Sequence, residues 1–89
     1  MQNFIVEITD TFGGEANYSW VRRYLVKSTS FRGAMSKVAK RYGAGWRNKY
    51  SSGDSAEYRM PGACIVAFVN WVEADYALEY PKLYNVEAI

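Results

Sequence analysis

The chain contains no histidine, which removes the Ser-His and Cys-His catalytic arrangements and most zinc sites. The remaining candidates for chemistry are Cys64 and two pairs of carboxylates, Asp10 with Glu15 and Asp54 with Glu57. If the two loops that carry these pairs met, they could bind a divalent cation or perform acid–base catalysis. Turn formation and solvation explain such carboxylates more simply. We therefore expect no catalytic residue, no metal site and no cofactor, and the chain is not expected to be an enzyme.

Two smaller motifs also have structural explanations. Cys64 lies in the most apolar stretch, residues 63–71, where a thiol is usually an inert core group. The Gly13-Gly14 pair resembles a fragment of a phosphate-binding loop, but it precedes an expected strand and lacks the lysine and hydroxyl of a Walker motif. We expect Cys64 in the core and the glycine pair in a hairpin loop.

Clustered positive charge is the strongest functional signal. The net charge is only +2, yet nine of the eleven basic residues, and no acidic residue, lie between Glu15 and Asp54. Such segregation favours an acidic protein face or nucleic acid as a partner. The expected partner-binding residues are Arg22, Arg23, Arg32, Lys37, Lys40, Arg41, Arg47 and Lys49. Trp46 and Tyr50 lie between these cations and could stack on unpaired bases, although core packing is the alternative for both rings.

Hydrophobic periodicity predicts the elements that position these residues. Alternating or apolar patterns predict strands at residues 4–9, 18–27, 46–50, 56–60 and 63–71. A polar loop is expected at residues 10–17, and the sequence leaves open which face of residues 18–27 is buried. Apolar residues at helical spacing predict an amphipathic helix over about 30–42, which Gly43 ends. Lys37, Lys40 and Arg41 lie on its polar face.

Together these elements predict an α+β fold of order β-β-α-β-β-β in one domain, residues 1–89. The sheet is expected to be single and mainly antiparallel, with the helix on one face. The stretch 63–71 is apolar on both faces and belongs in the middle of the sheet. This order matches neither an RNA recognition motif nor a double-stranded RNA-binding domain.

The C-terminal part predicts a short helix over residues 72–80 that Pro81 ends, with Ala74, Ala77 and Leu78 turned inward. Tyrosines recur every four residues in this part, among acidic residues. They are Tyr76, Tyr80 and Tyr84. We favour a stripe packed on the sheet, and the alternative is an acidic, tyrosine-rich patch for another protein or for self-association.

Location is indicated by apolar runs and by cysteine usage. No apolar run approaches the ~20 residues of a membrane helix, and residues 1–10 do not resemble a signal peptide. A lone cysteine agrees with a reducing compartment. We expect a cytoplasmic protein without a membrane partner.

Four segments, residues 10–24, 32–34, 53–58 and 62–64, resemble small uncharacterised proteins encoded in bacteriophage genomes. By analogy of class, the resemblance implies a non-enzymatic binding protein of the anti-CRISPR or anti-defence kind, which inhibits a host or defence protein complex through a charged surface. One alternative is direct, largely sequence-independent nucleic-acid binding through residues 22–49. A third is a structural or self-assembling virion component, and the separated charges are also compatible with a homodimer.

Overall fold

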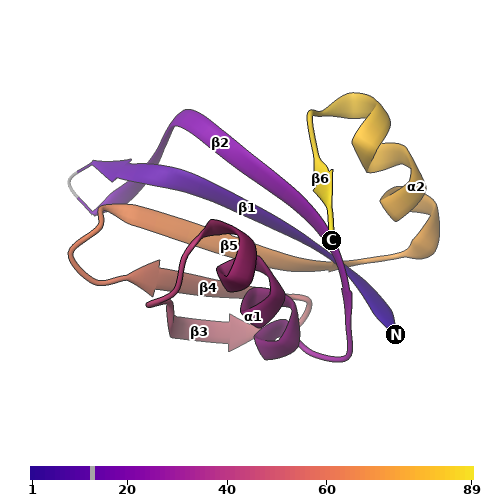
Figure 1. The fold of residues 1–89 in the computed structure, drawn as a ribbon, viewed down its shortest axis with the longest axis horizontal. Helices are drawn as coiled ribbons and strands as arrows, with labels where there is room; N and C mark the ends of the chain where they lie inside the picture. The colour runs from indigo at the N-terminus through magenta and orange to yellow at the C-terminus, as the bar shows by residue number, and fades with distance from the viewer. Residues whose placement is uncertain (13) are drawn as a thin grey trace.

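One six-stranded sheet with two helices makes up the fold, as Figure 1 shows for the computed structural model. The structure describes residues 1–12 and 14–89, without the side chain of Phe12. The elements are β1 (Gln2–Phe12), β2 (Glu15–Ser28), α1 (Phe31–Tyr42), β3 (Arg47–Ser52), β4 (Ser55–Met60), β5 (Ile65–Val72), α2 (Ala74–Leu83) and β6 (Glu87–Ala88). The predicted α+β class and the order β-β-α-β-β-β are confirmed.

The strand order in the sheet is β3-β4-β5-β1-β2-β6. Every neighbouring pair is antiparallel except β2 with β6, which is parallel. The predicted interior position of the apolar strand is confirmed, because β5 lies between β4 and β1. The two-residue strand β6 was not predicted from the sequence, and it forms one edge of the sheet while β3 forms the other.

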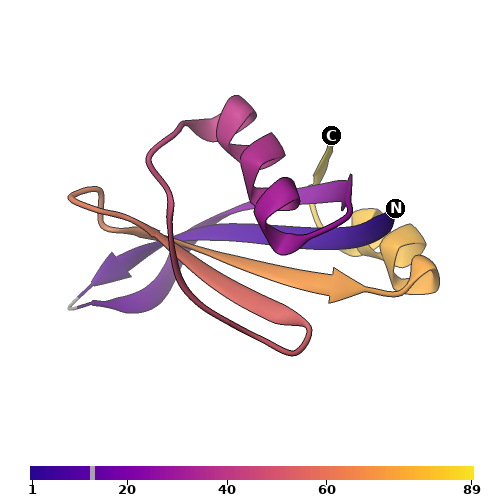
Figure 2. The ribbon, with the colours of Figure 1, turned by 90° about the horizontal axis from the view of Figure 1, so that it is seen from below.

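The main core lies between the sheet and α1, which covers one face, while α2 lies on the other side (Figure 2). Alternate residues of four strands point toward α1, as the two-residue period of a strand requires. The buried set on this face comprises Phe4, Val6, Ile8, Tyr24, Val26, Ala56, Tyr58, Ala67 and Val69. Ala34, Met35 and Val38 of α1 complete it. The inward face of β2 is therefore the one that carries Tyr24 and Val26.

Local signals fix both ends of α1. The Ser30 side chain accepts a hydrogen bond from the Gly33 N–H at 3.0 Å, which satisfies one free donor of the first turn. At the other end, the Gly43 N–H donates to the Ala39 carbonyl at 2.9 Å, and Gly43 has a φ of 149° that suits glycine. The predicted helix over about 30–42 is confirmed.

The first hairpin is longer than predicted and contains an irregularity. β1 and β2 continue through most of the expected loop at residues 10–17. Thr9 pairs with Val21 but Thr11 pairs with Ala16, so the intervening residues of β2 bulge opposite Asp10. The Asp10 carboxylate accepts hydrogen bonds from the Ser19 N–H at 3.0 Å and the Asn17 side chain at 3.2 Å. Of the predicted glycine loop, Gly13 lies outside the described residues.

The expectation that Cys64 is a core residue is wrong. The Ala63 N–H donates to the Met60 carbonyl at 3.1 Å, and Gly62 between them has a φ of 80°, as the second central position of a type II turn requires. The turn then extends through Cys64, which is exposed and has a φ of 51°. β5 consequently begins at Ile65, after the thiol.

The C-terminal helix also differs from its prediction. α2 continues to Leu83 with Pro81 inside it, and the Tyr84 N–H still donates to the Tyr80 carbonyl at 3.2 Å. Ala77 and Tyr80 are buried as the helix docks, but Leu78 is 71% exposed and Ala74 is also exposed. Only one of the three residues predicted to turn inward does so. Neither α1 nor α2 is long and apolar enough to cross a membrane.

Tyr80 secures α2 to the sheet. Its hydroxyl donates to the Glu7 carboxylate at 2.7 Å, and the Arg23 guanidinium bonds the same carboxylate at 3.1 Å (Nε to Oε2). Tyr76 and Tyr84 flank the Tyr80 ring, with centroid separations of 5.9 and 5.0 Å. The predicted stripe is therefore continuous through Pro81 and packs on the sheet through its central ring.

We predict that Tyr80→Phe destabilises the fold by about 1 kcal/mol, because the Glu7 carboxylate loses a hydrogen bond. Burial raises the pKa of Tyr80, so unfolding favours its deprotonation above roughly pH 10, and stability falls as the pH rises. The variant should lose less stability than the wild type between about pH 9 and 11. Urea unfolding at several pH values measures both effects, and identical curves for the two proteins would contradict this role of Tyr80.

Candidate binding surface

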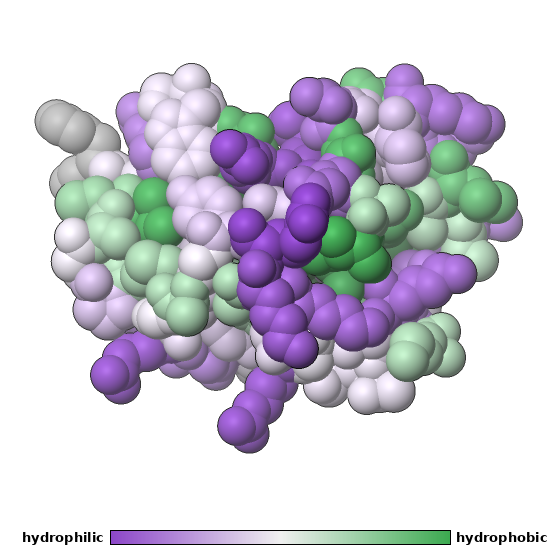
Figure 3. Space-filling model, viewed as in Figure 1, coloured by the Kyte–Doolittle hydropathy of each residue, from purple (hydrophilic) through white to green (hydrophobic). Residues whose placement is uncertain are grey.

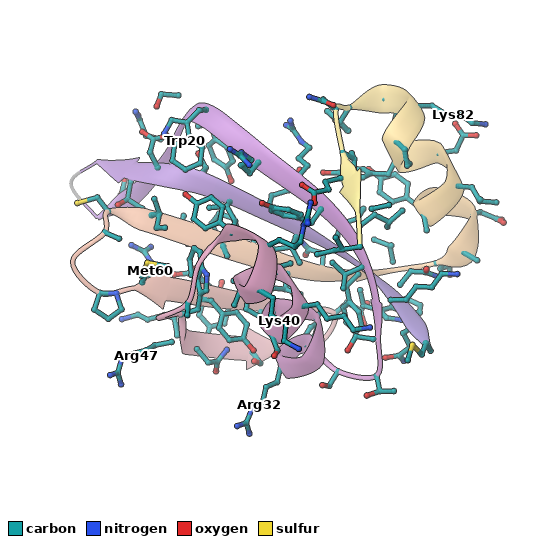
Figure 4. The ribbon with its side chains drawn as sticks, in the orientation of Figure 1. Trp20, Arg32, Lys40, Arg47, Met60 and Lys82 are labelled. Carbon is teal, nitrogen blue, oxygen red and sulfur yellow. The ribbon has the colours of Figure 1, made fainter. Side chains whose placement is uncertain are left out.

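The outer side of α1 carries the centre of the predicted basic set. Arg32, Lys37, Lys40 and Arg41 are all exposed, because the opposite side of the helix packs into the core. Hydrophilic side chains gather over α1 and along the border below it in Figure 3. In Figure 4 Lys40 lies on α1, and Arg32 and Arg47 project from the adjacent border of the molecule.

Three further cations extend this surface from neighbouring strands. Arg22 of β2 is exposed, and its guanidinium carbon lies 6.0 Å from the ring centroid of Tyr42 at the end of α1. Arg47 and Lys49 are exposed on the edge strand β3, at the border of the molecule, where Arg47 pairs with Arg59 and so points to the face away from α1. We define the basic surface as Arg22, Arg32, Lys37, Lys40, Arg41, Arg47 and Lys49.

Arg23 is a predicted cation that makes structural contacts on the sheet face away from α1. Neighbouring residues of a strand point to opposite faces, so Arg23 points away from Arg22. It bonds Glu7, and its guanidinium carbon lies 4.3 Å from the centroid of the Tyr84 ring. This cation therefore connects β1, β2 and α2.

Two cations of the basic surface also make structural contacts. The Lys37 ammonium donates to the Lys27 carbonyl at 2.6 Å, and Arg41 forms an ion pair with Glu87 of β6. Among the described residues, the other members of the surface take part in no ion pair. The Lys27 carbonyl carries no net charge, so Lys37 also keeps its positive charge for a partner.

The two predicted stacking rings do not form a common platform. Trp46 is half-buried against the core, and its indole N–H donates to the Gly43 carbonyl at 2.9 Å. Tyr50 pairs with Glu57, which lies between two core residues of β4 and so points away from α1. The rings consequently point to different faces of the sheet.

A pocket of about 560 Å³ opens between α1 and the β3–β4 hairpin, at the border of the basic surface. Its lining includes Arg32, Trp46, Asn48 and Tyr58. Burial raises the pKa of Tyr58, so its hydroxyl stays neutral. One cation, one ring and two neutral polar groups suit an acidic or aromatic side chain. Sequence reasoning missed Asn48 and Tyr58, whose only signal is their strand alternation with Trp46.

Acidic residues lie mostly on the opposite side of the molecule. Glu7 and Glu57 point away from α1, and the α2 region contributes Glu73, Asp75 and Glu79. The molecule thus has a positive side around α1, whereas on the other side Glu7, Glu57 and Glu79 form ion pairs with Arg23, Arg59 and Lys82. This separation follows from the strand alternation and from the placement of the two helices.

The carboxylate pairs considered for catalysis do not meet. Asp10 pairs with Ile65 at the start of β5, whereas Asp54 precedes Ser55, which pairs with Asn70 near its end. Five residues of strand separate these places by roughly 16 Å. Glu57 bonds Arg59 instead, at 2.9 Å. Within residues 1–12 and 14–89, no group of three or more Cys, Asp or Glu side chains could hold a metal ion.

We predict that Asp10→Asn makes the free energy of unfolding less dependent on pH under acidic conditions. Hydrogen bonds from Ser19 and Asn17 lower the pKa of Asp10 to about 2, so its contribution is complete above its usual value of 3.8 and is lost as the pH falls through 2. The variant should be less stable at pH 7 and lose less stability between roughly pH 4 and 2. Urea midpoints measure this, with Asp54→Asn as a control for the removal of one charge. Equal profiles for Asp10→Asn and Asp54→Asn would contradict the bulge contact.

We also predict that Cys64 reacts with a thiol reagent without unfolding, because its side chain is exposed in a turn. One equivalent of thiol should react with the reagent in buffer, and its rate should lie within about tenfold of the rate in urea. Val66→Cys combined with Cys64→Ser gives a matched buried thiol, since Val66 is fully buried. A slow reaction at Cys64 that urea accelerates by orders of magnitude would show that the thiol is buried.

A scan of protein-family models, a search of curated proteins and a search of solved structures each found no match to this chain. The fold class and the placement of the basic surface therefore rest on the chain itself. Function is inferred below from the geometry of that surface.

Proposed function

We propose that the chain is a non-enzymatic binding protein whose basic surface docks on an acidic face of a partner protein. In line with the resemblance to small phage proteins, the partner would be a host or defence protein complex that this docking inhibits. The cations around α1 would steer and orient the encounter, since complementary potentials chiefly raise the association rate and the specificity. The pocket beside Trp46 would supply the buried anchor that most stable interfaces contain.

The observation that carries the proposal is the separation of charge between the two sides of the molecule. Cations of the basic surface such as Arg32, Lys40 and Arg47 form no ion pair within the described residues. The fold therefore keeps an exposed positive surface although the net charge is only +2. An acidic partner face would be attracted to this side of the molecule, which orients the docking.

The aromatic residues favour protein over single-stranded nucleic acid. Stacking platforms present exposed rings between cations, but Trp46 is half-buried and Tyr50 points to the other face. The pocket, in contrast, combines Arg32 with Trp46 in one concave place. A single acidic or aromatic side chain from a partner would contact both.

Direct nucleic-acid binding is the second candidate, and the spacing of the cations favours it. Exposed cations of β2 and α1 lie on one side of the molecule and those of β3 lie at its edge, so together they could contact successive phosphates. Such binding would be largely independent of base sequence, because phosphate contacts carry no sequence information.

Charge reversal combined with photo-crosslinking tests the proposal in bacterial cells. A photo-reactive amino acid replaces Ser36, which is exposed on α1, or Leu78, which is exposed on α2. We expect one acidic protein to crosslink in a defined complex from position 36 and not from position 78. Adding Lys37→Glu and Lys40→Glu should lower that yield by about tenfold or more, equivalent to roughly 1.4 kcal/mol of binding.

The matched control is Lys82→Glu, which reverses one charge on α2 and should leave the yield unchanged. Because Lys37 also contacts the Lys27 carbonyl, Lys40→Glu alone must lower the yield as well, and circular dichroism must show folded variants. Equal yields from positions 36 and 78, or no effect of the reversals, would refute the assignment of the basic surface. Crosslinking mainly to nucleic acid would favour the second candidate.

A further inference from the structure

The outer edge of β2 is only partly covered. β2 has 14 residues, but β6 pairs only with Tyr24 and Leu25 near its C-terminal end. In Figure 1, β6 diverges from β2 toward α2 and leaves the preceding part of β2 as an edge of the sheet. A hollow of about 350 Å³ opens at this divergence, lined by β2 residues 21–24 and by residues 85–87.

Hydrogen bonds show which backbone groups point to this edge. The Leu25 carbonyl accepts from the Ile89 N–H at 3.0 Å, so the backbone groups of Leu25 point outward, toward β6. In a strand, residues two apart point the same way, so Val21 and Arg23 also direct their N–H and C=O groups outward. The Trp20 carbonyl faces inward, because it accepts from the Thr9 hydroxyl at 2.8 Å. Because β6 pairs at Tyr24 and so takes up the outward carbonyl of Arg23, Val21 is the residue of this pair whose N–H and C=O are both open to another strand within the described residues.

Beside this edge, one aromatic side chain lies next to a hollow in the surface. Trp20 is 40% exposed, so part of its ring is accessible to a partner. A second hollow, of about 340 Å³, is lined by Trp20, Val21, Arg22 and Tyr42. Trp20 and Arg22 are two residues apart and therefore lie on the same face of β2. Figure 4 shows Trp20 beside the part of β2 that β6 leaves uncovered.

We propose that two copies of this chain associate through these edges, with their β2 strands antiparallel about a two-fold axis at Val21. Val21 then exchanges two backbone hydrogen bonds with the partner's Val21, in the pattern of an antiparallel pair. The same register places Trp20 directly opposite the partner's Arg22, and Arg22 opposite the partner's Trp20. Each indole enters the hollow between the other copy's Arg22 and Tyr42, and each guanidinium contacts a ring.

Charge and space select this register over its neighbour. An axis at Arg22 would place two guanidinium groups directly opposite each other, and like charges in that position are destabilising. It would also place a partner residue opposite Tyr24, where β6 already pairs. With the axis at Val21, pairing ends before Tyr24, at the place where the bulge around Tyr18 turns the partner strand.

The dimer uses Arg22 of the basic surface and leaves the other cations of that surface exposed, so it adds to the proposed function without depending on it. A two-fold axis at a shared sheet edge continues the sheet and places both α1 helices on the same side. The basic surface would then be doubled, so a partner with repeated acidic sites could bind more tightly through two contacts. The paired stretch is short, so we expect a weak dimer that forms as the concentration rises.

Sedimentation equilibrium of the purified chain tests the pairing. The mass should rise from the monomer value of 10.2 kDa toward twice that value, over roughly 10 µM to 1 mM. Trp20→Arg should abolish the rise, because it places two cations opposite each other across the axis. The double variant Trp20→Arg with Arg22→Trp exchanges the two partners within the register, and it should restore the rise.

Val21→Pro provides a second route if Trp20→Arg does not fold. The Val21 N–H points outward, so proline removes the intermolecular donor without removing a bond to β1. This variant should stay monomeric while circular dichroism shows an intact sheet. A constant mass of wild type up to about 1 mM would overturn the proposal. Failure of the double variant to restore dimers, or dimerisation of Val21→Pro, would overturn it as well.

Discussion

The fold depends on covering both faces of β1, which is a central strand of the sheet. Its alternate residues Phe4, Val6 and Ile8 are at most 2% exposed beneath α1, and each such burial contributes roughly 1.5–3 kcal/mol. The opposite face of β1 carries Glu7 between Ile5 and Thr9, so it cannot be covered by apolar contacts alone. Arg23 and Tyr80 satisfy the Glu7 carboxylate and bring α2 onto that face.

The charge separation of the molecule follows from these two ways of covering β1. On the α1 side, apolar packing is sufficient, so the outer positions of the helix are free to carry cations. On the other side, Arg23 forms an ion pair with Glu7, and α2 adds acidic residues around its tyrosine stripe. A small net charge therefore coexists with one strongly positive side. The uncovered edge of β2 has the same origin, because α2 holds the C-terminal segment away from most of that strand.

Strong local patterns predicted the central elements correctly. The helical spacing of apolar residues, preceded by the capping Ser30, predicted α1. Residues 63–71 are apolar on both faces, which predicted the interior position of β5. The bulge at Asp10 was not predictable, because it depends on side-chain hydrogen bonds between β1 and β2. Cys64 was misplaced because its apolar neighbours suggested a strand, while the Pro61-Gly62 turn extends one residue further than its own signal.

The candidate site was predictable in part for the same reason. The cations of α1 share a face by helical periodicity alone, so the sequence locates them. Arg22 and Arg23 are adjacent, and only the strand register decides that one joins the basic surface and the other binds Glu7. The pocket depends on packing between α1 and the β3–β4 hairpin, which are brought together only by the sheet order. Neither could be derived from residue types and spacing.

The central claim is that the basic surface serves an acidic protein face. Fluorescence anisotropy of labelled single-stranded DNA, double-stranded DNA and RNA tests it most directly, at roughly 50 and 200 mM salt, where phosphate contacts weaken steeply. The proposed function predicts no binding at micromolar protein concentrations even at the lower salt, because Trp46 is half-buried and Tyr50 points to the other face, so bases gain no stacking platform and only phosphate contacts remain. Micromolar or tighter binding that collapses at the higher salt would contradict the claim and identify nucleic acid as the partner.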